Sequence, residues 1–214
     1  MLGKRIGMAL VFLVFLTLAW MNWNVVDRVR VNGPVYQKMV MGKDLLADSL
    51  PPPSYLLQAY HTVVQLALAG ANEPKELERL LESYEKSKKE FESRHQYWLE
   101  HLSEPLLKEK ELAEYQSGKE LLESVDQSLF PLLKSGKNEA ILNCLNSTIT
   151  PKYRKHLECV NELVAATVSY NQQVELEAKQ AVEYCKIILA SYLLLTLSSI
   201  AAWRFYRVIA RYIA

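Results

Sequence analysis

The sequence has little net charge, few glycines and no obvious repeat. Its 25 Lys and Arg residues and 24 Asp and Glu residues nearly cancel, and only 7 of the 214 residues are glycine. Nucleic-acid binding needs a clustered excess of basic side chains, so the composition gives no reason to expect a nucleic-acid partner. No strand-like alternation of useful length, internal repeat or low-complexity tract is evident, which leaves a helical protein.

Motifs for catalysis and metal binding are also missing. The sequence has no glycine-rich phosphate loop, no nucleophile elbow, and no HExxH or CxxC spacing. Glu92 and His95 form a single i, i+3 pair, whereas a di-metal bundle needs Glu-x-x-His on each of two helices. His101 is six residues from His95, and His61 and His156 lie far from this pair in the sequence. We therefore expect no enzyme activity, no catalytic residue, no cofactor and no metal site.

Charged residues are absent from two apolar segments near the ends of the chain. Residues 6–26 contain no charged side chain, and neither do residues 187–203. The first segment would be about 31 Å long as a helix, enough to cross a hydrocarbon core of about 30 Å. The second is shorter, but Arg204 and Arg207 can snorkel to the interface. We predict two transmembrane helices, at residues 6–26 and 187–209.

A cleaved signal peptide is the alternative for the first segment, because a short basic region precedes it. The apolar stretch is long for a signal peptide, and no small-residue cleavage pattern follows it. Trp20 and Trp23 also lie where an interfacial aromatic belt would, which favours an uncleaved anchor. The basic residues outside the two segments predict cytoplasmic ends, residues 1–5 and 210–214, and an extracytoplasmic domain at residues 27–186.

Two parts of this domain carry apolar residues at alternating steps of three and four. One seam runs from Leu77 to Leu102 and the other from Leu157 to Ile188. This spacing is typical of helices packed against partner helices. No Pro or Gly follows Pro151, so we predict one helix that begins near Thr150 and continues into the second membrane span.

Proline, glycine and polar clusters set the other predicted helix ends. A helix leaves the first span and restarts at Ser54, and another bends at Pro131 and ends near Asn146. The predicted breaks are residues 51–53, 70–74, a loose corner at 103–118, 135–136 and a turn at 147–150. The expected fold class is all-α, an antiparallel four-helix bundle whose first and last helices continue into two transmembrane helices.

Four runs of residues resemble the sensor region of one subgroup of bacterial methyl-accepting chemotaxis proteins. They are VNGPVY at 31–36, GKDL at 42–45, ADSLPPPSY at 47–55 and RHQYW at 94–98. The resemblance covers residues 31–98 closely and 99–186 only by helix pattern. It implies a homodimeric sensor domain in the bacterial inner membrane that binds a small molecule on the periplasmic side.

The resemblance departs from a full receptor at the C-terminal end. Residues 208–213 resemble the start of a HAMP helix, with Tyr212 where proline is usual, and the chain ends at Ala214. We therefore expect a sensor region without the signalling region: a truncated receptor, a fragment, or a stand-alone sensor that pairs with full-length chemoreceptors. The alternative is a non-sensory membrane scaffold or interaction protein of the cell envelope.

Polar residues on the apolar seams are the strongest indication of a binding site. A buried Lys or His costs several kcal/mol unless it is paired. For Lys88 and Asn171 we favour structural roles, Lys88 extending to solvent and Asn171 fixing helix register. An arginine fork beside aromatic rings suits a small carboxylate. The candidate ligand-binding residues are Arg94, His95, Tyr97 and Trp98 on the second helix, and Tyr36, Lys43, Asp48 and Tyr55 at the start of the domain.

Cys144 and Cys159 are a candidate disulfide across the predicted turn at 147–150. In an antiparallel pair their axial offset would be about 7 Å, which disfavours the bond unless the turn is asymmetric. Cys185, on the seam near the membrane boundary, is expected to pack as a small apolar residue.

Overall fold

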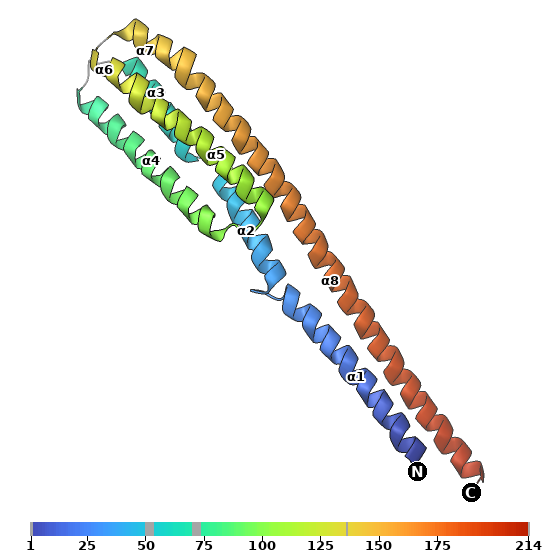
Figure 1. Ribbon diagram of the computed structural model, residues 1–214. Coiled ribbons are helices and arrows are strands. Elements are labelled where there is room, and N and C mark those ends of the chain that lie inside the picture. The colour runs from blue at the N-terminus through green and yellow to red at the C-terminus, as the bar shows by residue number, and fades with distance from the viewer. Residues whose placement is uncertain (1, 50–53, 70–73, 136, 214) are drawn as a thin grey trace. The chain divides into compact units, whose positions relative to one another are not determined.

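A computed structural model describes residues 2–49, 54–69, 74–135 and 137–213 (Figure 1). Helix accounts for 96% of the structure, and no described residue lies in a strand. The prediction of an all-α fold is therefore confirmed.

Eight α-helices and two short π-helical segments follow one another in the described residues. The α-helices are α1 (Leu2–Val29), α2 (Pro34–Ser49), α3 (Ser54–Ala69), α4 (Pro74–His101), α5 (Pro105–Ser124), α6 (Phe130–Ser135), α7 (Asn138–Cys144) and α8 (Thr150–Ile213). The π-helical segments are η2 (Val125–Leu129) and η3 (Leu145–Ile149). Two compact units result: a core unit, Met41–Asn171, and an apolar unit, Met1–Val40 with Gln172–Ala214. The predicted breaks at 51–53 and 70–73 lie outside the described residues.

The core unit packs its helices lengthwise around a common interior (Figure 1). Helices α4 and α5 are antiparallel, because Lys88 contacts Asp126 near one end and His95 contacts Glu111 near the other. Helices α5 and α8 are also antiparallel, because two ion pairs join them in opposite residue order: Lys110–Glu162 (2.7 Å) and Lys155–Glu120 (3.1 Å). The main core cluster draws on α3, α4, α5, α7 and α8 and includes Leu56, Val63, Tyr84, Phe91, Leu121, Ile141 and Tyr153.

The first predicted seam, and the second as far as Asn171, face the interior of the core unit. Tyr84, Phe91 and Trp98 on α4 are at most 5% exposed, and the described seam positions between them are at least half-buried. On α8 the seam residues Val160 and Thr167 are buried. The 3-4 spacing therefore identified the packed faces of these two helices.

The predicted loose corner at 103–118 is wrong. Only residues 102–104 are non-helical there, and α5 begins at Pro105. Proline has no backbone N–H, but a residue in the first turn of a helix needs none, so Pro105 starts the helix instead of interrupting one. Residues 105–118 are thus part of a continuous packed helix.

The predicted turn at 147–150 is also wrong. Segment η3 joins α7 to α8 without a break, and the Thr150 N–H donates to the Leu145 carbonyl, five residues earlier. The same arrangement precedes Pro131, where the Phe130 N–H donates to the Val125 carbonyl. A prolyl ring clashes with the carbonyl four residues before it, and locally widening the helix to the π form relieves this clash.

This continuity removes the candidate disulfide. Cys144 and Cys159 lie on one uninterrupted helical path, fifteen residues apart, which is an axial separation of about 22 Å. A disulfide requires Cα atoms within about 7 Å. All three cysteines are free thiols in the structure.

The apolar unit differs from the sequence prediction near residue 30. The helix that was expected to continue from the first span ends at Val29, and α2 begins at Pro34. Asn32 has a φ of 64°, and a Cβ on Gly33 would lie 2.7 Å from the Arg28 and Asp27 carbonyl oxygens. The chain can therefore fold back on the end of α1 only with glycine at position 33.

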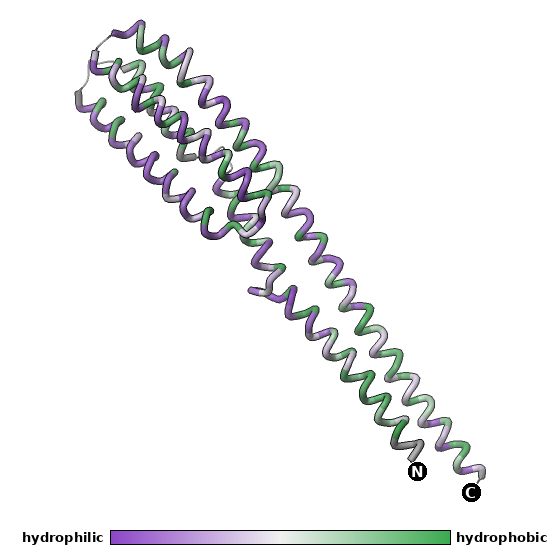
Figure 2. Tube along the Cα trace, viewed as in Figure 1, coloured by the Kyte–Doolittle hydropathy of each residue, from purple (hydrophilic) through white to green (hydrophobic). Residues whose placement is uncertain are grey.

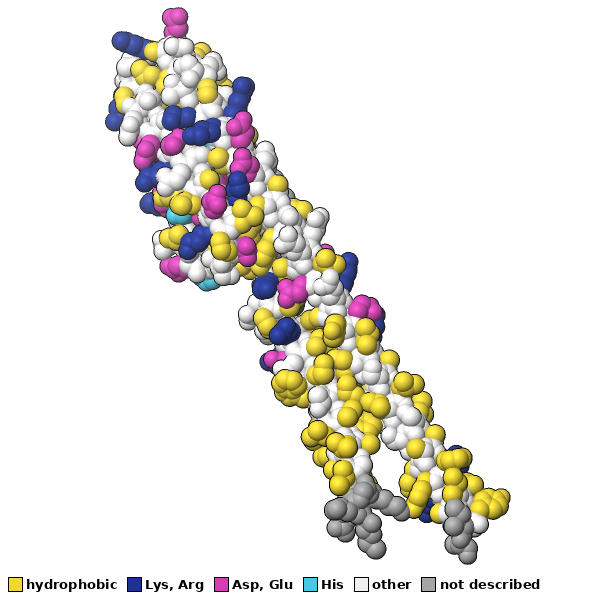
Figure 3. Space-filling view, turned by 45° about the vertical axis from the view of Figure 1, so that its right-hand side comes forward, with side chains coloured by type: hydrophobic (Ala, Val, Ile, Leu, Met, Phe, Trp, Pro, Cys, Tyr) yellow, Lys and Arg dark blue, Asp and Glu magenta, His cyan; other side chains and the backbone are white. Residues whose placement is uncertain are grey.

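Within the apolar unit, α1 and the C-terminal part of α8 run antiparallel. The rings of Phe15 and Tyr192 meet edge to face at 4.8 Å between centroids, and Lys38 pairs with Glu177 at 3.5 Å. Both helices are long and apolar enough to cross a membrane, with mean hydropathy of 1.9 and 1.8 in their most apolar windows. Figure 2 colours much of both helices in this region as hydrophobic, and Figure 3 shows hydrophobic side chains on their surface.

These two helices are much less buried than the core helices of a soluble protein. In the most apolar stretch of the first helix no part is buried, and in the most apolar stretch of the second helix only 6% is buried. The structure thus agrees with two candidate membrane-spanning helices. The predicted domain, 27–186, is longer than the core unit, because residues 27–40 and 172–186 belong to the apolar unit.

Candidate functional site

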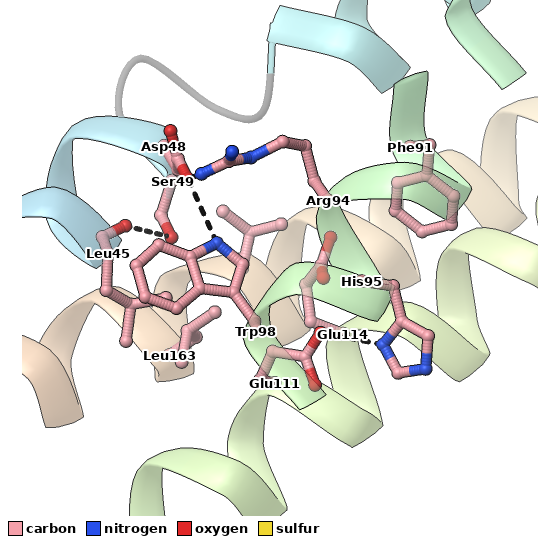
Figure 4. A pocket seen from close by; sticks show the side chains of 11 residues that line it. Leu45, Asp48, Ser49, Phe91, Arg94, His95, Trp98, Glu111, Glu114 and Leu163 are labelled. Carbon is pink, nitrogen blue, oxygen red and sulfur yellow. Dashed lines mark hydrogen bonds and ion pairs between the residues drawn. The ribbon is translucent and has the colours of Figure 1, made fainter. Parts of the chain in front are cut away.

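A cavity of about 40 Å³ lies inside the core unit, between α2, α4, α5 and α8 (Figure 4). A volume of this size holds a few water-sized groups. Its lining is apolar on α8 and mixed polar and aromatic on the other helices. The lining residues are Leu45, Asp48, Ser49, Phe91, Arg94, His95, Trp98, Glu111, Glu114, Val160 and Leu163.

Asp48 is the centre of a polar contact between α2 and α4. The Arg94 guanidinium forms an ion pair with Asp48 Oδ2, and the Trp98 Nε1–H donates to the same oxygen at 2.9 Å. The guanidinium also lies over the Tyr97 ring, 4.6 Å from its centroid. The arginine fork that the sequence assigned to a ligand carboxylate is therefore occupied by a carboxylate of this chain.

The structure brings together four of the eight predicted site residues. Asp48, Arg94, His95 and Trp98 line the cavity. Tyr97 is 38% exposed and supports the guanidinium from outside.

Two of the other three predicted residues, Lys43 and Tyr36, are not among those that line the cavity. Lys43 is exposed on α2, because Leu45, Asp48 and Ser49 form the inward face of that helix. Tyr36 belongs to the apolar unit. The side chain of Tyr55 lies outside the described residues.

His95 reaches across to α5 and contacts Glu111. Its Nδ1 lies 2.7 Å from Glu111 Oε1, and its ring stacks on Tyr115 with 3.5 Å between centroids. Glu111 is only 3% exposed, and burial raises the pKa of its carboxyl, partly offset by His95. The second carboxyl oxygen, Oε2, is buried and has no hydrogen-bond partner.

Glu114 and His156 form a second buried acid–base contact next to Glu111. The Ser117 hydroxyl donates to the Glu114 carbonyl at 2.7 Å. The Ser117 Oγ can therefore accept a hydrogen bond from His156 Nδ1–H at 3.1 Å. These hydrogen bonds assign His156 as the neutral tautomer that carries its proton on Nδ1 and none on Nε2. That nitrogen lies 3.4 Å from Glu114 Oε1 without forming a hydrogen bond.

Burial sets the charge state of this pair. It raises the pKa of Glu114 to about 8, with a smaller contribution from the Glu111 charge. It lowers the pKa of His156, which is 0% exposed, to about 4. Near neutral pH the contact therefore joins a protonated carboxyl to an uncharged imidazole.

Sequence reasoning missed Glu111, Glu114 and His156 as site residues. A signal was present: Leu107, Glu111, Glu114, Gly118 and Leu121 follow the 3-4 spacing of a packed helix face. The face was overlooked because Pro105 suggested a loop. His156 likewise lies on the buried face of α8, one turn before Val160.

Two further polar seam residues have structural roles. Lys88 was expected to extend to solvent, but its ammonium pairs with Asp126, to which Tyr84 Oη also donates at 3.0 Å. Asn171 is buried, as the seam predicted, and its Oδ1 would lie 2.0 Å from a Cβ on Gly42. Gly42 thus permits the close approach of α2 to α8 at this point.

Within the described residues, no group of three or more His, Cys, Asp or Glu side chains could hold a metal ion. The chain matches no protein-family model, no curated protein and no solved structure.

The Asp48–Arg94 pair should contribute modestly to stability. Its side chains are 30% and 34% exposed, so solvent screens the attraction, and we expect a coupling energy of about 1 kcal/mol. The measurement is a double-mutant cycle of Asp48→Asn and Arg94→Met, read from chemical unfolding of the full chain in detergent. A coupling energy of zero would show that the two side chains act independently.

Proposed function

We propose that the protein is a membrane-anchored sensory receptor domain that binds a small extracytoplasmic molecule and transmits binding through α8. The single observation that carries this proposal is the continuity of α8. One helix, Thr150–Ile213, provides a wall of the cavity at Val160 and Leu163 and also contains the second apolar segment. Ligand binding that favours one position of this helix over another would therefore act on both parts of the chain.

The finer architecture belongs to the same proposal. The core unit is a four-helix sensor bundle, supported by the antiparallel contacts of α4 with α5 and of α5 with α8. Residues 6–26 and 187–209 span the bacterial inner membrane, with both termini in the cytoplasm and residues 27–186 in the periplasm. The antiparallel contacts of α1 with α8 and the basic residues at the chain ends support this arrangement.

The resemblance of residues 31–98 to chemoreceptor sensor regions supports the assignment to chemotaxis-type signalling. It also supports a homodimer that acts together with full-length chemoreceptors.

A non-sensory membrane scaffold is the second candidate function. The observation that favours it is that the Arg94 guanidinium already pairs with Asp48, so its charge is neutralised without a ligand. The two candidates differ in one measurable property, since only a receptor domain binds a small molecule in the core unit.

Thermal-shift screening of the full chain in nanodiscs tests the proposal. The panel contains small amines, amino acids and organic acids. A ligand at 100 times its Kd should stabilise the protein by about 2.7 kcal/mol, which gives a readable shift in the unfolding midpoint. Val160→Phe fills the cavity and should abolish the shift. A panel without any hit, or a hit that Val160→Phe leaves unchanged, would contradict a ligand site in this cavity.

A further inference from the structure

The cavity contains more acidic than basic groups that are free to act on a ligand. Arg94 is neutralised by Asp48, and His95 faces Glu111 Oε1. Glu111 Oε2 remains without a partner although its residue is 97% buried. A buried acceptor without a hydrogen bond is costly, so its persistence calls for a donor that enters the cavity.

The Glu114 carboxyl adds a second acceptor next to this oxygen. Glu114 lines the same cavity (Figure 4) and is 8% exposed, and its Oε1 lies 3.4 Å from the bare Nε2 of His156. Two carboxyl groups one helical turn apart on α5 thus line the same small cavity. Phe91 and Trp98 provide aromatic surfaces on the α4 side.

We propose that this cavity binds a small monocation with N–H donors, ammonium or methylammonium, held by the carboxyl groups of Glu111 and Glu114 and by the aromatic rings of Phe91 and Trp98. The inference deepens the proposed function and rests on it, because it names the ligand class of the same site. Carboxylates accept charge-assisted hydrogen bonds from such a cation, and aromatic faces attract it.

The size and charge of the cavity select this class over larger or anionic ligands. About 40 Å³ admits a guest of one or two heavy atoms. A ligand carboxylate would meet the two glutamates, while Arg94 is held by Asp48. Alkali cations lack N–H donors and cannot hydrogen-bond to Glu111 Oε2.

Binding exchanges one cation for one proton. The groups facing Glu114 are Glu111 on the same helix, Asp48 on α2, Arg94 and His95 on α4, and His156 on α8. Near neutral pH Glu114 is protonated, since burial raises its pKa to about 8. The cation enters, the Glu114 O–H bond breaks, its electron pair stays on the carboxylate and the proton passes to solvent. Below pH 8, the affinity for the cation should therefore increase about tenfold for each unit by which the pH is raised.

Isothermal titration of the full chain in nanodiscs with methylammonium chloride tests the inference. We expect saturable binding that tightens about tenfold from pH 6 to pH 7, with release of about one proton per cation. Potassium chloride and tetramethylammonium chloride should give no binding. Glu111→Gln should weaken methylammonium binding at least tenfold, whereas Glu109→Gln, the same change on the exposed face of α5, should not.

Val160→Phe is the second variant, because it fills the cavity without replacing either carboxyl group. It should abolish methylammonium binding. The inference is overturned if methylammonium does not bind, if potassium binds equally well, or if Glu111→Gln and Val160→Phe both bind like the unaltered protein. In each of these cases, the proposed receptor function would still be supported by a thermal-shift ligand whose binding is blocked by Val160→Phe. Methylammonium binding without any signal transmission would contradict the receptor and leave the cation site intact.

Discussion

Raising the pH from about 6.5 to 8 should lower the free energy of unfolding of the core unit by about 2 kcal/mol. The folded state keeps a proton on Glu114, whose pKa burial raises to about 8, whereas the unfolded chain releases it above a pH of about 4.5. The unfolded state thus binds fewer protons over this range, and stability falls as the pH rises. Burial also raises the pKa of Glu111, which acts in the same direction.

Glu114→Gln should remove most of this decrease, because the amide does not titrate. The measurement is chemical unfolding of the full chain in nanodiscs, followed by the loss of helical circular dichroism in phosphate buffer without amines. Glu109→Gln is the matched control on the exposed face of α5 and should keep the decrease. A Glu114→Gln variant that loses stability with pH as steeply as the unaltered protein would contradict a protonated, buried Glu114.

His156 contributes with the opposite sign at lower pH. Its pKa in the folded state is lowered to about 4 because the ring is buried, whereas the unfolded chain takes up a proton below about pH 6.5. Its contribution to stability is therefore lost as the pH falls from about 6.5 to 4. The two groups together place the maximum stability in the mildly acidic range.

Gly118→Val should destabilise the core unit by about 3 kcal/mol. Gly118 lies on the buried face of α5, where a Cβ would come within 2.5 Å of Phe91 Cζ and 2.7 Å of Leu56 Cδ1. Both neighbours belong to the packed core and have little room to move. Valine adds two further methyl groups to this contact, and the free energy of unfolding measures the cost.

Gln116→Val is the control that places a valine on the exposed face of the same helix, where no steric clash is expected. Gln116 is exposed on the same helix, so its substitution should cost no more than about 0.7 kcal/mol. Equal costs for Gly118→Val and Gln116→Val would mean that Gly118 is not closely packed. Because Phe91 also lines the cavity, we expect Gly118→Val to weaken binding of any panel hit as well.

The helix faces were predictable wherever apolar spacing was regular. The seams around Tyr84 and Val160 were read from the sequence because burial of one face imposes a 3-4 period. Prolines were misread at two places. Pro105 starts a helix, and Pro151 lies inside one after a π-helical segment, since its clash is relieved by local widening. Nothing in the local sequence distinguishes these cases from a break.

The candidate site was predictable only in part. Arg94 and Trp98 were recognised because an arginine beside aromatic residues is typical of a binding site. Asp48 was predicted to bind a ligand, but its pairing with Arg94 depends on the packing of α2 against α4. Glu111 and Glu114 follow the 3-4 spacing of a packed helix face, but acidic residues in a charged stretch are normally exposed, and the structure shows that these two are buried.

The most direct test of the receptor function is transmission through α8. A signalling module joined after Ala214 reports the response to the panel molecule that gives the largest thermal shift. Two glycines inserted after Ala178 interrupt the helix, whereas a duplicate of residues 172–178 adds a heptad and keeps the helix phase within about 20°. We expect the glycine insertion to abolish the response while leaving binding intact, and the heptad insertion to retain it. An undiminished response with the glycine insertion would contradict transmission through a continuous α8.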